Sequence, residues 1–317
     1  ESTKDSNSAT KTIGNILISI DDLLDKINID ALLVLGDTNS CLAVIPAKRR
    51  KIPIFHMEAG NRCFDLRVPE EINRKIVDHI ADVNLTYSTI SRDYLIKEGL
   101  NPQFVIKTGS PMKEVINFYL EDILKSKILE KMDLRKYQFF LISLHREENL
   151  DDPIKFKKFI KVINFLSEKY SIPIIISTHP RTRKKIEQKN IKFDSNVKLI
   201  KPLGYFDYVN LQIFSKLVLS DSGTITEESS ILNFPALNLR DSTERPEGFE
   251  EGSVMMVGLS TFNIFNAIQI LEKQTRGKIR SLDLIKDYDV NNVSDKIIRI
   301  LVSFIEKVNK DVWKKVE

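Results

Sequence analysis

The sequence contains few cysteines and no long apolar run. Cys41 and Cys63 are its two cysteines among 317 residues, which excludes a disulfide framework and favours a reducing compartment. No apolar run approaches the roughly 18 residues that a membrane-spanning helix needs, and no secretory signal peptide is recognisable. We therefore expect a cytoplasmic protein without a membrane partner.

Motifs for common cofactors and for nucleic acid are also absent. Neither GxGxxG nor GxxxxGK[ST] occurs, so neither NAD nor P-loop hydrolysis of a nucleoside triphosphate is indicated, and we expect no cofactor. The net charge of +4 is small and no basic block is interleaved with aromatics, which makes nucleic acid a weak hypothesis. Without HExxH or a cysteine cluster, a metal site formed by Asp37, His56 and Glu58 is a minor alternative.

The pattern that is present alternates short apolar segments with amphipathic helices. The segments read ALLVL, IPIF, FVIK, FFLIS, PIIIS, KLVLS and PALNLR. Continuous apolar strands that alternate with helices predict parallel sheets covered on both faces, hence an α/β fold. We expect an N-terminal domain over 1–115, a second domain over 116–290, and a C-terminal helix within 291–317 that packs back on the first domain.

Polar residues follow almost every predicted strand. Three of the four histidines, His56, His145 and His179, lie at such strand ends. Because ligands bind outside the carboxyl ends of the strands in open α/β sheets, we expect these ends to form the functional site. If the two sheets face each other, the site lies in a cleft between the domains.

The segment SDSGTITEESSIL indicates an anion site. A strand, a turn at Ser222-Gly223 and a helix place free backbone N–H groups at one point. The structural alternative is a capping box between Thr224 and Glu227. Both can hold if one glutamate caps the helix while Glu228 meets sugar hydroxyls.

Two further strand ends carry a histidine close to an arginine. His145 is followed by Arg146, and His179 lies two residues before Arg181. Arginine forks onto phosphate oxygens and histidine can donate a proton to a leaving oxygen, so both pairs suit a diphosphate.

A helix is predicted to begin at Pro69, because proline is favoured at a first helical position. Ile72, Ile76, Ile80 and Val83 would form its buried stripe. The opposite face would carry Glu70, Asn73 and Arg74.

Two interpretations of the acidic residues on this helix are open. Glu70 and Glu71 can complement the helix dipole, with a surface pair between Glu70 and Arg74. Alternatively, Asp37, Glu58 and Glu70 converge from different elements as acid and base groups. Such a set suits epimerisation, in which acid and base act on opposite faces of one carbon.

Five motifs resemble the non-hydrolysing UDP-N-acetylglucosamine 2-epimerase family. They read GDT, HMEAG, PEEINR, HREEN and SDSG…EE…RDSTERPE, in order, over residues 30 to 250. The wording LGDTNSCLAVIPAKRRKIPIFHMEAGNRCFDLRVPEEINRKIVDH resembles the UDP-N-acetyl-L-fucosamine synthase branch more closely. In the main branch Leu-Arg usually follows the motif's glycine, whereas Asn61-Arg62 follows it here.

The resemblance implies two Rossmann-like domains of the GT-B type facing across a cleft, a homodimer, and a UDP-sugar substrate. The family's opening strand and Gly-Thr-Arg-Pro-Glu turn have no counterpart here, so we expect a missing N-terminal segment. By motif match the catalytic residues are Asp37, Glu58, Glu70 and His145, and the UDP-binding residues are Arg146, His179, Arg181, Tyr208, Ser222, Gly223 and Glu228. Tyr208 would stack on uracil, and Arg240 and Arg245 are further cleft residues, more often structural.

The chemistry of the sugar limits the mechanism. Its C2 hydrogen is not adjacent to a carbonyl, so simple enolisation cannot remove it. We therefore expect elimination of UDP to a 2-acetamidoglycal, followed by re-addition, with UDP-2-acetamido-2,6-dideoxy-L-talose as the substrate in surface-polysaccharide biosynthesis. The alternatives are the same reaction on UDP-N-acetylglucosamine, a GT-B glycosyltransferase, or a UDP-sugar sensor.

Overall fold

The computed structural model describes residues 8–144, 146, 152–178 and 180–315. It divides into two compact units: Glu1–Pro111 with Asp289–Glu317, and Met112–Tyr288. The last segment of the chain thus belongs to the first unit.

The first unit contains a four-stranded parallel sheet in the order β1-β2-β3-β4. Its strands are β1 (Leu32–Leu35), β2 (Ile54–Ala59), β3 (Val83–Thr86) and β4 (Val105–Lys107). Its helices are α1 (Ala9–Leu24), α2 (Val44–Arg49), α3 (Pro69–Ile80), α4 (Thr89–Lys97) and α14 (Val293–Asp311), with 3₁₀ turns at Asn39–Ala43 and Pro102–Phe104.

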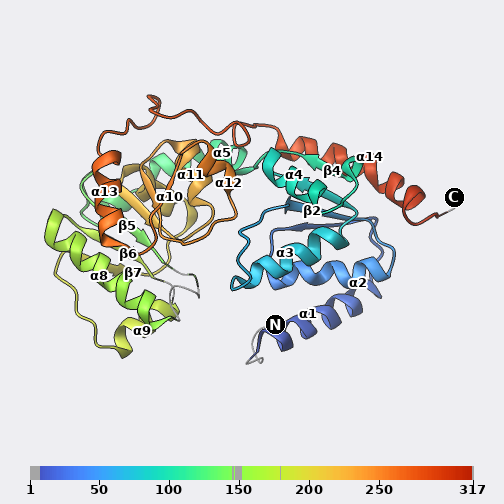
Figure 1. Ribbon diagram of the computed structural model, residues 1–317, viewed down its shortest axis with the longest axis horizontal. Helices are drawn as coiled ribbons and strands as arrows, with labels where there is room; N and C mark the ends of the chain where they lie inside the picture. Colours follow the sequence, from blue (N-terminus) through green and yellow to red (C-terminus); the bar gives the residue numbers. More distant parts are fainter. Residues whose placement is uncertain (1–7, 145, 147–151, 179, 316–317) are drawn as a thin grey trace. The chain divides into compact units, whose positions relative to one another are not determined.

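Alternation along β2 explains why both faces of this sheet are covered. Ile54 packs with Val44 and Val77 on one face, while Phe55 packs with Ile297 of α14 on the other. Successive side chains of a strand point to opposite faces. Figure 1 accordingly shows α1, α2 and α3 on one side of the sheet and α14 on the other.

Helix α3 buries only part of the stripe that the sequence predicts, since Ile76 and Ile80 are partly buried against the core of this unit. Ile72 is 49 % exposed, and Val83 belongs to β3 because the helix ends at Ile80. The buried side chains of α3 are Glu71, Asn73, Arg74, Val77 and Asp78. The predicted Glu70–Arg74 surface pair is also wrong, since the buried Arg74 pairs with Asp37 and Glu71.

The second unit contains a six-stranded parallel sheet in the order β10-β9-β8-β5-β6-β7. Its strands are β5 (Phe140–Ser143), β6 (Ile174–Ser177), β7 (Val197–Ile200), β8 (Leu217–Ser220), β9 (Ala236–Asn238) and β10 (Met255–Met256). Its helices are α5 (Met112–Lys125), α6 (Ile128–Lys131), α8 (Pro153–Tyr170), α9 (Pro180–Gln188), α10 (Tyr205–Phe214), α11 (Ile225–Leu232), α12 (Pro246–Glu250) and α13 (Thr261–Leu271).

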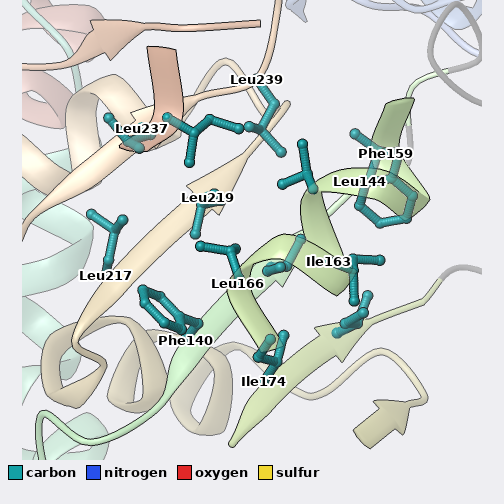
Figure 2. Close-up of a cluster of buried hydrophobic side chains, with 14 of the residues drawn as sticks. Phe140, Leu144, Phe159, Ile163, Leu166, Ile174, Leu217, Leu219, Leu237 and Leu239 are labelled. Atoms are coloured by element: carbon teal, nitrogen blue, oxygen red, sulfur yellow. The ribbon is translucent and has the colours of Figure 1, made fainter. Parts of the chain in front are cut away.

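The core of the second unit lies between this sheet and α8. Figure 2 shows Phe140 and Leu219 from the sheet in the same cluster as Phe159 and Ile163 of α8. The other face of the sheet buries a second cluster that includes Leu141. Sheets covered on both faces need continuously apolar strands, and for this reason the apolar runs of the sequence predict the strands.

No helix in the described part of the chain is both long enough and apolar enough to span a membrane.

Candidate active site

The carboxyl ends of β1 and β2 place two of the predicted carboxylates together. Glu58 lies at an irregularity of β2, where the pairing register with β3 shifts between Met57 and Ala59, and its φ is +67°. A β-bulge of this kind re-aims a side chain. A Cβ added to Gly36 would lie 3.4 Å from Glu58 Oε2, so the turn after β1 passes close to this carboxylate.

Asp37 is held by helix α3. Arg74 donates from Nε to Asp37 Oδ2 over 2.8 Å, and its Nη2 lies 2.7 Å from the same oxygen. Asn73 Nδ2 donates to the Asp37 carbonyl over 2.9 Å. These contacts fix both the backbone and the side chain of Asp37.

The thiol of Cys41 interacts electrostatically with both carboxylates. Burial raises the pKa of this thiol, and the negative charges of Asp37 and Glu58 raise it further. Both carboxylates therefore lie within electrostatic range of the Cys41 thiol. Glu70 occupies the first turn of α3, the helix that holds Asp37, and its side chain is half-buried.

His56 lies beneath this site and is 1 % exposed. Its Nε2 donates to the Gly36 carbonyl and its Nδ1 donates to Asp78 Oδ1, both over 2.8 Å. Burial lowers the pKa of His56, but the hydrogen bond and charge of Asp78 and the Gly36 carbonyl outweigh it, so the net shift is upward. The favoured imidazolium donates from both nitrogens and fixes the turn at Gly36.

This environment removes His56 from the metal alternative. A metal ligand needs a free lone pair on one ring nitrogen, and both nitrogens of His56 are engaged. Within the described ranges, no group of three or more His, Cys, Asp or Glu side chains is arranged to hold a metal ion.

Glu71 does more than complement the dipole of α3. It is completely buried and accepts hydrogen bonds from the backbone N–H groups of Cys63 and Phe64 and from Arg74 Nη1. The sequence-based interpretation of Glu71 is therefore incomplete. This carboxylate ties the loop after β2 to the helix that holds Asp37.

In the second unit, part of the predicted site lies outside the described residues. This applies to His145 and His179, and the side chain of Arg181 is likewise not described. Arg146 is described: its backbone N–H donates to Asp221 Oδ2, and its guanidinium donates to the Asp221 carbonyl and to Glu244 Oε1.

Ser222 and Gly223 form the turn between β8 and α11, beside Arg146. The Ser222 and Thr224 hydroxyls lie 3.0 Å apart. A Cβ on Gly223 would overlap Glu244 Oε1, so a side chain at this position would displace that carboxylate. Two predicted UDP-binding residues, Arg146 and Gly223, thus meet at Glu244.

The predicted capping box is wrong. Thr224 already has helical backbone angles and makes no side-chain cap hydrogen bond to the helix. Glu227 instead pairs with Arg245, whose Nε donates over 3.1 Å. The buried Arg240 pairs with Glu244. Arg240 and Arg245 therefore stabilise the loop around the site.

Glu228 is buried and held by neutral donors. Gln212 Nε2 donates to Glu228 Oε2 over 2.6 Å, and Thr224 also donates to the carboxylate. Burial raises the pKa of Glu228, and the charge of Glu227 adds to this shift against the two hydrogen bonds. Burial and the charge of Glu228 also raise the pKa of Tyr208, whose hydroxyl bonds Ser143. Tyr208 thus lies within electrostatic range of Glu228.

Sequence reasoning missed Gln212, Glu244 and Asn61 as parts of these sites. Gln212 lies between two apolar residues of its helix, and nothing in the sequence distinguishes it as a site residue. Glu244 lies in the STERPE segment, and its spacing from other polar residues does not distinguish it either. Asn61 was noted for its difference from the family's usual leucine, yet its contact with Glu58 depends on the bulge.

Together, the two parallel α/β units and the residues at their strand ends define an enzyme of the GT-B-like epimerase class. Comparison with known proteins agrees. The family model described as "UDP-N-acetylglucosamine 2-epimerase" matches residues 2–302. The chain belongs to this family and is therefore an isomerase.

Individual relatives support this assignment. The structure of UDP-N-acetylglucosamine 2-epimerase from Rickettsia bellii is 47 % identical, has a TM-score of 0.91, and aligns over 98 % of this chain and 83 % of that one. The Methanocaldococcus jannaschii UDP-GlcNAc 2-epimerase, solved with UDP-GlcNAc and UDP, is 31 % identical with a TM-score of 0.85, over 94 % and 82 %.

One curated relative is named for another sugar. UDP-2,3-diacetamido-2,3-dideoxy-D-glucuronate 2-epimerase of Pseudomonas aeruginosa is 34 % identical over 248 residues, which are 77 % of this chain and 68 % of that protein.

Proposed function

We propose that the protein epimerises C2 of a UDP-2-acetamido sugar by eliminating and re-adding UDP. The observation that carries this proposal is the pair of carboxylates, Asp37 and Glu58, held beside Gly36 at the end of the first sheet. Membership of a 2-epimerase family supports it.

In the proposed reaction, a carboxylate removes the C2 proton while the bond from C1 to the UDP oxygen breaks. The product is a 2-acetamidoglycal and free UDP. UDP then adds back to C1, and a second acid delivers a proton to the opposite face of C2. We assign the acid and base roles to Asp37, Glu58 and Glu70, because acid–base catalysis needs groups of this kind on both faces.

The departing UDP needs its own stabilisation. We assign His145 to the leaving diphosphate, and Arg146, His179, Arg181, Tyr208, Ser222, Gly223 and Glu228 to UDP. The guanidinium of Arg146 and the side-chain-free turn at Gly223 are the described features that suit a diphosphate.

Two substrates are candidates. UDP-2-acetamido-2,6-dideoxy-L-talose, which would give UDP-N-acetyl-L-fucosamine for a surface polysaccharide, rests on the resemblance of the segment around NRCFD. UDP-N-acetylglucosamine, which would give UDP-N-acetylmannosamine, rests on the sugar named for the Rickettsia and Methanocaldococcus relatives. The name of the Pseudomonas relative, which refers to a third sugar, favours a test of both.

NMR of the products after incubation with each UDP-sugar tests the proposal. The same incubation in D₂O must place deuterium at C2 of the product. Turnover without this label contradicts elimination. Product formation only with an added acceptor identifies a glycosyltransferase, and UDP-sugar binding without turnover identifies a sensor.

A homodimer and a cytoplasmic location are part of this proposal. Light scattering coupled to size-exclusion chromatography tests the first, with a mass near twice 36.5 kDa as the expected result. Cell fractionation tests the second.

A further inference from the structure

Asn61, the first residue after the HMEAG motif, contacts Glu58 directly. Its Nδ2 donates to Glu58 Oε1 over 3.2 Å. Asn61 is 1 % exposed. Because a buried amide is hydrogen-bonded within the protein rather than to bulk water, the Glu58 carboxylate is a structural partner of this side chain.

Two serines fix the orientation of this amide. Ser91 donates its hydroxyl to Asn61 Oδ1 over 3.0 Å, and Ser88 donates to Ser91 Oγ over 3.0 Å. An amide oxygen can only accept, so the direction of the chain is set. Flipping the amide would turn Oδ1 towards the Glu58 carboxylate, and the two acceptors would repel each other.

Backbone geometry brings the loop to these serines. Gly60 has a φ of +79°, and a Cβ there would overlap the Ser91 carbonyl. A residue with a side chain would push the loop away from α4. The Gly60 contact therefore places Asn61 against Ser91, at the first turn of α4.

We propose that Asn61 is a positioning residue that holds Glu58 for proton transfer, through a chain of donors that runs from Ser88 through Ser91. All three donors of this chain point towards the carboxylate, and hydrogen bonds aligned in this way polarise one another. In this chain the support acts on a carboxylate whose positive φ and bulge leave its side chain outside the regular strand geometry. This inference rests on the proposed 2-epimerase function.

A double-mutant cycle tests the role. In Asn61→Leu we expect kcat to fall about 10- to 100-fold with KM within about two-fold, because a small displacement of a reacting group is costly. In the Glu58→Gln background the same change should cost nothing further, since Asn61 acts through Glu58. The rate of deuterium incorporation at C2 should fall by the same factor as kcat.

Two other variants separate positioning from folding. Ser91→Ala removes the donor to Asn61 with little change in volume, and we expect a two- to ten-fold loss of kcat, about the worth of one hydrogen bond. Asn210→Leu replaces another buried asparagine, in the second unit, and should lower the melting temperature without lowering kcat.

Unchanged kcat in Asn61→Leu and Ser91→Ala, or an equal loss in the Glu58→Gln background, overturns the proposal. A wild-type protein that epimerises neither UDP-sugar overturns the proposed function together with this inference. Wild-type turnover with unaffected variants overturns the inference alone.

Discussion

In the first unit Asp37 is ion-paired with the buried Arg74, whereas in the second unit Glu228 receives its hydrogen bonds from Gln212 and Thr224, which are neutral. The difference matches the proposed division of work. A carboxylate fixed by charged partners is held in place for proton transfer. A desolvated carboxylate with neutral partners is suited to accept hydrogen bonds from the hydroxyl groups of a bound ligand.

The comparison extends to the layers below each site. Beneath Asp37 and Glu58 lies a network of His56, Asp78 and Arg62, in which Arg62 Nη1 donates to Asp78 Oδ2 over 2.6 Å. Removing one partner of such a buried network leaves a charge uncompensated. At the turn by Gly223, the second unit instead has Glu244 paired with Arg146 and Arg240.

Glu58→Gln should have the largest effect, because it removes a proposed proton acceptor from the first unit alone. We expect kcat to fall about 10²- to 10⁴-fold, the usual contribution of a general acid or base. UDP affinity, measured by calorimetry, should stay close to that of the wild type. A loss of UDP affinity instead would mean that Glu58 binds UDP, and the proposed separation of proton transfer in the first unit from UDP binding in the second would be wrong.

Two neighbours on α3 give the next largest effect. Glu71→Gln should lower the free energy of unfolding by about 3 kcal/mol, because Arg74 loses one buried carboxylate. Ile72→Ala should change it by less than about 0.5 kcal/mol, since the side chain is half exposed. Urea denaturation of both variants measures the two values. A larger loss of unfolding free energy in Ile72→Ala than in Glu71→Gln would mean that Ile72 is buried, as helix periodicity predicts.

This pair of residues shows what the sequence could reveal. Apolar runs identified β5 and β8, because a fully buried parallel strand must be continuously apolar. Helix periodicity was only partly right at α3: Ile76 and Ile80 pack against the core, but polar side chains of this helix are buried as well. Period alone cannot distinguish a solvated face from a paired one.

The candidate site was predictable to a similar degree. Polar residues at the strand ends pointed to Asp37, Glu58 and Ser222, because strand ends share one edge of a sheet. The bulge at Glu58 depends on backbone geometry, and the partners of Glu227 and Glu228 are residues distant in sequence, Arg245 and Gln212. No local spacing encodes them.

Gly223→Ala tests the second unit by itself. The added methyl group would overlap the Glu244 carboxylate, so we expect UDP affinity to fall about 10- to 100-fold from displacement of the turn. Gly204→Ala is the matched control, because a Cβ at Gly204 meets nothing within 4 Å. Calorimetric titration with UDP measures both. Equal affinities for the two variants would exclude the turn as the UDP site.

The smallest effect, on stability against pH, concerns His56 in the first unit. The folded pKa of His56 lies above its ordinary value of 6.5, so its stabilisation is complete below about pH 6.5 and is lost as the pH rises through the folded pKa. Wild-type stability should therefore decline over this range, and the decline should be shallower in His56→Gln, which cannot ionise. Melting temperatures between about pH 6 and 9 measure both slopes. Parallel slopes would mean that His56 is neutral in the folded protein, and Nδ1 or Nε2 would then lack its proton. The turn at Gly36 would then lack the charged histidine that holds it in this unit.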